Sequence, residues 1–160
     1  MGEALKQRLK QEKFSSPYQE AMLAVMVCAD RLNRSMDETC ERYGITAAQY
    51  NVLRILRGVY PDGHPRCEII TRMIHVAPDV TRLIDRLEKL DLAERTKSQH
   101  DLRLSVTMIT QKGLDLLESI QPEVNEIEKQ LSAGLTEKEA GQLADLCDKV
   151  TSSVATSAVA

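Results

Sequence analysis

Residues 77–113 read APDVTRLIDRLEKLDLAERTKSQHDLRLSVTMITQKG, and this stretch decides the fold. Its first part has apolar residues at the spacing of one helical face, namely Val80, Leu83, Ile84, Leu87 and Leu90. Pro78 suits the first turn of such a helix, where its missing N–H costs nothing, and Asp79 complements the positive helix end. Two extended segments follow, Leu92 to Thr96 and Leu104 to Thr110, joined by a polar loop. The stretch therefore predicts a helix followed by a projecting β-hairpin.

A second short helix is predicted immediately before this stretch, from Arg66 to Ile74. Two short helices separated by a tight turn and followed by a hairpin have the order of a winged helix-turn-helix. In such a unit the second helix enters the major groove of DNA, and the hairpin reaches the neighbouring minor groove or phosphates. We therefore expect a mainly α fold with a small β-hairpin wing and with terminal dimerisation helices.

The second helix of this unit presents a row of cations. Arg82, Arg86 and Lys89 lie at i, i+4 and i+7, on one side of the helix. Thr81 lies near its N-terminus, where base edges are closest in such complexes. Taken alone, the row also fits a solvated helix face whose cations pair with the acidic residues of the same helix. The hairpin that follows favours contact with nucleic acid.

The hairpin carries a more specific pattern. Asp101-Leu102-Arg103 is followed by a short strand and then by Ile109-Thr110-Gln111-Lys112-Gly113. With the helix at 80–88, this pattern resembles the MarR (multiple antibiotic resistance regulator) family of bacterial repressors. The resemblance implies that Arg103 is the wing-tip arginine inserted into the minor groove, oriented by a charge-assisted hydrogen bond that it donates to Asp101. A loop ion pair would explain these two residues, but not the strands and the Thr-x-x-Gly that follow.

Two positions depart from the family pattern. Asp91 stands where the family usually has glycine after the recognition helix, and Asp tolerates left-handed backbone better than most residues. Leu102 replaces an arginine that is common in the wing, which removes one cation and weakens the expected phosphate binding. The residues expected to contact DNA are Pro78, Asp79, Thr81, Arg82, Arg86, Lys89, Lys97, Asp101 and Arg103.

One such unit covers only a half-site, so two copies related by a two-fold axis are needed to match a pseudo-palindrome. We assign residues 1–45 to N-terminal helices that are part of the dimerisation region, 46–113 to the winged DNA-binding domain and 114–160 to C-terminal dimerisation helices. Apolar residues of the two termini are candidates for the homodimer interface: Leu5, Leu9, Leu131, Leu135, Leu143, Leu146 and Val150.

Capping signals mark the starts of three further helices. Thr46 with Gln49 and Thr136 with Glu139 have the spacing of capping boxes. Thr110 is expected to cap a long helix after the hairpin. The last helix is expected to end near residue 150, with a frayed tail beyond it.

The net charge of −3 at first argues against a nucleic-acid partner, because phosphate binding needs local positive charge. The distribution of charge is more informative. Arg66 to Lys112 carries nine Lys/Arg against seven Asp/Glu, a net +2, whereas Leu114 to Ala160 carries three against nine, a net −6. The middle of the chain can therefore face DNA while the acidic end stays away from it.

Composition places the chain among cytoplasmic proteins. Its 160 residues fit one domain with an appendage, and no run of about 18 apolar residues or signal-like N-terminus predicts membrane insertion or secretion. The four cysteines lack metal-ligand spacing and are expected to be reduced thiols. Cys28 is expected to be buried, and Cys67 is the best candidate for an oxidant sensor. We expect no cofactor, no metal and no catalytic constellation.

By the resemblance, a small aromatic or phenolic effector held between the DNA-binding lobe and the dimerisation helices releases the DNA. Most of its candidate residues lie on a helix predicted from Ser16 to Tyr43, and ordinary core packing explains them equally well. They are Tyr18, Met22, Met26, Tyr50 and Arg54. The alternative function is a winged-helix protein-interaction module without specific DNA binding, which the acidic total charge favours slightly. An enzyme ranks third.

Overall fold

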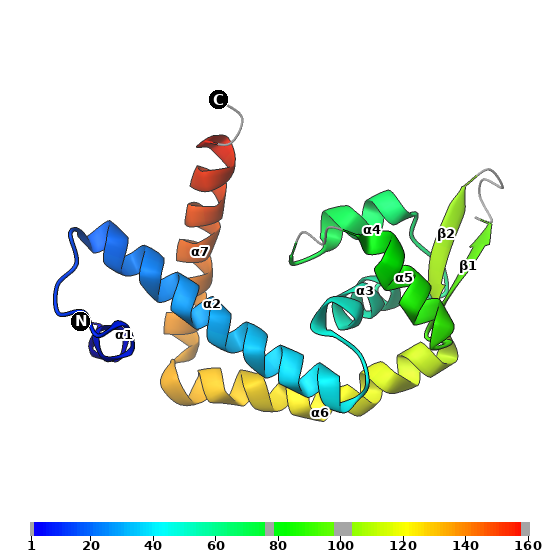
Figure 1. Ribbon diagram of the computed structural model, residues 1–160, viewed down its shortest axis with the longest axis horizontal. Coiled ribbons are helices and arrows are strands. Elements are labelled where there is room, and N and C mark those ends of the chain that lie inside the picture. Colours follow the sequence, from blue (N-terminus) through cyan, green and yellow to red (C-terminus); the bar gives the residue numbers. More distant parts are fainter. Residues whose placement is uncertain (1, 76–78, 98–103, 158–160) are drawn as a thin grey trace. The chain divides into compact units, whose positions relative to one another are not determined.

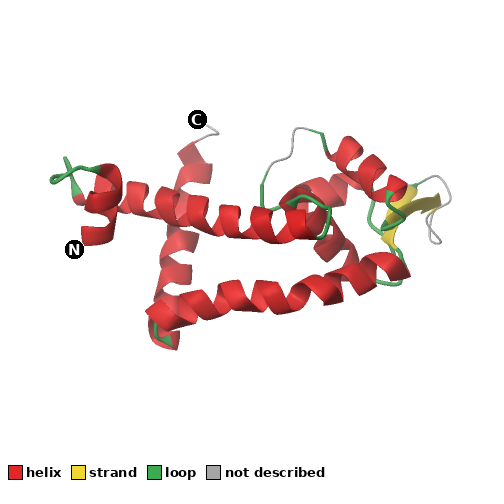
Figure 2. Cartoon of the chain, turned by 60° about the horizontal axis from the view of Figure 1, so that its bottom comes forward, coloured by secondary structure: helices red, strands yellow, loops and turns green. Residues whose placement is uncertain are grey.

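The computed structural model describes residues 2–75, 79–97 and 104–157. It is mainly helical, with one antiparallel hairpin, as Figure 2 shows, so the predicted fold class is confirmed. The helices are α1 (Glu3–Leu9), α2 (Pro17–Arg42), α3 (Ala47–Arg57), α4 (Arg66–Arg72), α5 (Val80–Lys89), α6 (Gln111–Gly134) and α7 (Glu137–Ser157), and the strands are β1 (Ala93–Lys97) and β2 (Ser105–Ile109). Among these helices, none is both long and apolar enough to cross a membrane.

The chain divides into two compact units, Met1–Pro122 and Glu123–Ala160. The first contains α1 to β2 and the first half of α6, and the second contains the rest of α6 and α7. Within the first unit, α5 packs against β1 and α3 against β2, and α4 contacts both α3 and α5 (Figure 1). The division into an N-terminal, a DNA-binding and a C-terminal region stays a prediction.

The core of the first unit fixes α5 and the hairpin against α3. Val52, Leu53 and Leu56 of α3 are fully buried. On α5, Val80, Ile84 and Leu87 are buried as their helical spacing predicts, whereas Leu83 is half-buried and Leu90 is exposed. Leu92, Ala93, Val106 and Ile109 add the inner side of the hairpin. Burying these aliphatic side chains is the main source of stability, at about 1.5–3 kcal/mol for each fully buried one.

Both predicted capping boxes are present. The Gln49 backbone N–H donates to Thr46 Oγ1 at 3.2 Å, and the Thr46 N–H donates to Gln49 Oε1 at 2.9 Å. Thr136 and Glu139 exchange the same pair of bonds, at 3.3 and 2.9 Å. The Thr136 N–H and the Thr136 hydroxyl both donate to the Glu139 carboxylate and hold its pKa below its usual value. Thr110 Oγ1 accepts from the Gly113 N–H at 3.1 Å and so caps α6.

The C-terminal end of α5 orients the hairpin. The Leu92 N–H donates to the Leu87 carbonyl at 2.9 Å, and the Asp91 N–H donates to the Glu88 carbonyl at 2.9 Å, which is a Schellman motif. The motif requires left-handed backbone at Asp91, whose φ is 58°. Asp91 therefore adopts the left-handed backbone at the position where the family usually has glycine, and the chain still turns directly from α5 into β1.

The first strand of the hairpin begins and ends one residue later than the sequence pattern predicts. Ala93 pairs with Ile109, and the register continues to Lys97 opposite Ser105. An isolated bridge joins His64 to β2: the His64 N–H donates to the Thr107 carbonyl at 3.0 Å, and the Thr107 N–H donates to the His64 carbonyl at 2.9 Å. The loop between α3 and α4 is thereby attached to the hairpin.

Three predicted features of the helices are wrong in detail. α5 begins at Val80, because the Asp79 carboxylate accepts from the Arg82 N–H at 3.0 Å and makes Asp79 the N-cap. α7 continues to Ser157 instead of fraying after residue 150, and the Thr151 hydroxyl donates to the Cys147 carbonyl at 2.9 Å within it. Leu5, a candidate for the dimer interface, is buried in the first unit, where α1 contacts α2.

Candidate nucleic-acid interface

The outer face of α5 carries exposed cations. Val80, Ile84 and Leu87 point into the core, which turns Arg82, Arg86 and Lys89 toward solvent. The Arg82 side chain is 75% exposed and lies 3.9 Å from Asp79, a distance typical of a weak surface ion pair. Among the described residues, Arg86 and Lys89 take part in no ion pair.

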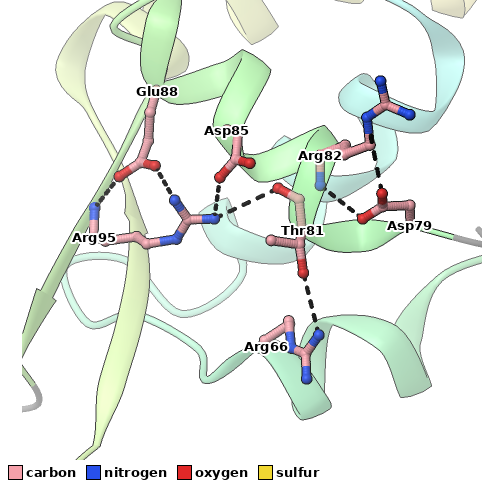
Figure 3. A network of polar contacts seen from close by, with 7 residues as sticks. All are labelled: Arg66, Asp79, Thr81, Arg82, Asp85, Glu88 and Arg95. Atoms are coloured by element: carbon pink, nitrogen blue, oxygen red, sulfur yellow. Dashed lines mark hydrogen bonds and ion pairs between the residues drawn. The ribbon is translucent and has the colours of Figure 1, made fainter.

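The acidic residues of α5 face the hairpin instead of these cations. Arg95 on β1 donates to Asp85 Oδ1 at 2.6 Å, and a second guanidinium nitrogen makes an ion pair with Glu88 (Figure 3). The alternative in which Asp85 and Glu88 neutralise the cations of their own helix is therefore wrong. The outer face of α5 keeps its positive side chains free of these two carboxylates, because both carboxylates pair with Arg95.

The hydroxyl of Thr81 already has a hydrogen-bond partner within the chain. Its hydroxyl accepts from the Arg66 guanidinium at 3.1 Å, so the first turn of α4 is joined to the first turn of α5. Between these helices and the hairpin lies a hollow of about 420 Å³. It is lined by Arg66, Thr81, Ile84, Asp85, Arg95, Ser105 and Thr107.

The stem of the hairpin contributes one further predicted residue. Lys97 is exposed at the end of β1, two residues beyond Arg95 and on the same face of the strand. Pro78, Asp101 and Arg103 lie outside the described residues. The structure thus places Asp79, Thr81, Arg82, Arg86 and Lys89 on α5 and its cap, and Lys97 on the strand that follows, and their contact with DNA stays a prediction.

Sequence reasoning missed two cations of this region, Arg66 and Arg95. Each has its partner 15 or fewer residues away, on a neighbouring element. The one available signal is the placement of Asp85 and Glu88 at i and i+3, which gives α5 an acidic side next to the face that must pack on the hairpin. An arginine on the first strand is well placed to meet that side.

The candidate effector residues fall into two groups. Tyr18, Met22 and Met26 lie in the N-terminal half of α2 and are exposed by 86%, 56% and 60%. Tyr50 is buried in α3, where its hydroxyl accepts from Arg54 at 3.3 Å and its ring lies 6.0 Å from that guanidinium. The second group is a local packing pair, and the role of both groups in effector binding stays a prediction.

The cysteines differ in exposure from the sequence expectation. Cys28, expected to be buried, is exposed on α2, whose buried residues Thr39 and Cys40 lie near its C-terminal end. Cys40 is the buried thiol, and burial together with the Asp37 charge raises its pKa to about 11. Cys40 is therefore a poor nucleophile at neutral pH. Cys67 is exposed at the start of α4.

Comparison with known proteins identifies similar chains. A MarR transcription factor from Planctomyces limnophilus has 34% sequence identity and a TM-score of 0.64, over 85% of this chain and 98% of that one. The MepR–DNA complex of S. aureus has 25% identity and a TM-score of 0.73, over 88% of this chain and 99% of that one. MhqR of Bacillus subtilis (strain 168), an HTH-type transcriptional regulator, is 27% identical over 120 residues, which are 74% of this chain and 81% of that protein. No family model matches the chain.

Proposed function

Because the chain belongs to the MarR family of transcription factors, we propose that it acts as a homodimer that binds a pseudo-palindromic operator in double-stranded DNA and represses transcription. Each subunit places the outer face of α5 in the major groove and the hairpin against the neighbouring minor groove. A small aromatic or phenolic effector releases the DNA by binding better to a dimer whose two α5 helices are wrongly spaced.

The observation that carries the proposal is the charge arrangement of α5. Arg82, Arg86 and Lys89 share one exposed side, and the acidic residues of the same helix are bound to Arg95. An acidic protein thereby presents a locally positive surface, which phosphate binding requires. The crystal structure of the similar MepR bound to DNA supports the same partner for this chain.

The experiment that tests the proposal is selection of bound fragments from random double-stranded DNA. We expect enrichment of an inverted repeat whose half-sites lie about 10 base pairs apart, centre to centre, with affinity that falls steeply as salt rises. The alternative, a winged protein-interaction module, predicts that no sequence is enriched and that no fragment binds even at low salt. That result would overturn the proposed function.

An apolar stripe on α7 supports the homodimer. Leu143, Leu146, Val150 and Val154 lie at i, i+3, i+7 and i+11, and all are exposed, Leu146 by 58%. A second copy of the chain would remove these side chains from water in a two-fold interface. The exposed apolar positions of α2 offer a second surface of the same kind.

Leu146→Glu is expected to raise the dissociation constant of the dimer at least about a hundredfold, because two carboxylates would enter one apolar interface. Sedimentation velocity at micromolar concentration measures the change. Ala144→Glu places the same charge away from the stripe and should leave the dimer intact. A dimer that tolerates Leu146→Glu would place the subunit interface elsewhere.

A further inference from the structure

The Arg95 side chain joins the hairpin to three successive turns of α5. It donates to Asp85 Oδ1 at 2.6 Å and to the Thr81 carbonyl at 3.5 Å, and its remaining contact is the ion pair with Glu88. The Arg95 backbone N–H also donates to Glu88 Oε1 at 2.9 Å. Figure 3 shows the guanidinium reaching from the strand across the helix to all three partners.

These contacts leave Arg95 poorly suited to bind phosphate. Its side chain is only 35% exposed, whereas that of Arg82 is 75% exposed. Two carboxylates already compensate its charge, and a phosphate would have to displace at least one of them at the cost of leaving it unpaired. Arg95 is basic and lies between the helix and the hairpin, but its contacts are directed into the protein.

The rest of the connection between α5 and the hairpin is short. Only Leu90, Asp91 and Leu92 separate the helix from β1. The Schellman motif fixes where the chain turns, and the buried Leu92 and Ala93 fix its inner side. Arg95 lies two residues beyond Ala93 and is the first exposed residue of the strand with several contacts to α5, so it sets the angle at which the strand leaves the helix.

We propose that Arg95 is a positioning residue that determines specificity: it holds the hairpin at the angle to α5 at which both reach their grooves on one DNA half-site. This inference rests on the proposed function. A planar guanidinium with several N–H donors is needed because the three acceptors lie on different turns, and the single ammonium of lysine cannot hold them together. If the network is lost, each DNA-contacting side chain stays on its own element. The angle between α5 and the hairpin then varies, so the two no longer reach their grooves on one half-site together.

The test compares Arg95→Lys with wild-type protein on the selected operator and on an unrelated duplex. We expect affinity for the operator to fall about tenfold, as for the loss of one charge-assisted hydrogen bond, while affinity for the unrelated duplex is unchanged. Hydroxyl-radical footprints should lose protection of the sugars on the side of the hairpin, whereas protection of guanine N7 from methylation in the major groove should be kept. Glu94→Gln, on the neighbouring exposed position of β1, is the matched control and should behave as wild type.

A second variant separates positioning from direct phosphate contact. Replacing Arg95 with Met, Asp85 with Asn and Glu88 with Gln removes the network without leaving an unpaired charge. We expect the operator affinity to fall while the slope of log affinity against log salt stays that of wild type. A slope smaller by about 0.9 would show that Arg95 binds a phosphate and would overturn the inference.

The remaining outcomes are distinguishable. If Arg95→Lys binds the operator as tightly as wild type, or loses the same factor on both duplexes, Arg95 does not determine specificity and the inference fails alone. If the wild-type protein selects no sequence, the proposed function fails, and the inference fails with it.

Discussion

Arg86→Glu is expected to lower the affinity for operator DNA by at least about a hundredfold. Arg86 lies in the middle of the exposed side of α5, one turn after Arg82, and makes no ion pair with another described residue. A bidentate contact from arginine to a base is worth about 1–3 kcal/mol, and a carboxylate at the same place adds repulsion from the phosphates. Titration of labelled operator, followed by fluorescence anisotropy at fixed salt, measures the loss.

Arg34→Glu is the matched control, because it makes the same change of charge on α2, where Arg34 pairs with Asp30 at 3.2 Å. Its effect on operator affinity should be at most a few-fold. Thermal unfolding should be nearly the same for both variants, since both side chains are exposed. Equal affinity of Arg86→Glu and wild type at low salt would mean that α5 does not face DNA.

The sequence was sufficient for the features that local chemistry determines. The helical spacing of Val80, Ile84 and Leu87 set the inner face of α5 and with it the outward direction of Arg82 and Arg86. Capping boxes have fixed spacing and were found where they were expected. The family pattern of the hairpin was specific enough to predict the winged fold. In each case the interacting residues are close in sequence or belong to one motif.

The features that depend on packing between elements could not be predicted in the same way. The Arg95 network needs the helix and the strand to cross at one angle, which no spacing within either element encodes. The exposure of Cys28 and the burial of Leu5 depend on how far α1 and α2 pack on the rest of the unit. Helical periodicity identifies an apolar face but not the neighbour that covers it.

The Thr-x-x-Gly after the hairpin illustrates both cases. Thr110 was expected as a helix cap from its residue type, and it is one. The resemblance to the family pattern singles out Gly113 but gives no physical reason for a glycine there. The structure supplies that reason: Gly113 lies in the first turn of α6, where a Cβ would overlap the Leu92 carbonyl oxygen and lie 2.7 Å from Ile109 Cγ1.

Gly113→Ala is therefore expected to destabilise the protein by about 2–4 kcal/mol, although alanine is normally the better helix former. The Leu92 carbonyl cannot move away cheaply, because it accepts from the Thr110 N–H at 3.2 Å and follows directly on the turn out of α5. Urea unfolding measures the loss. Gly141→Ala is the control: nothing lies within 4 Å of its added Cβ in α7, so it should stabilise by up to about 1 kcal/mol. If both variants gained stability, α6 would not pack this closely on the turn that joins α5 to β1, and the angle between helix and hairpin would need another explanation.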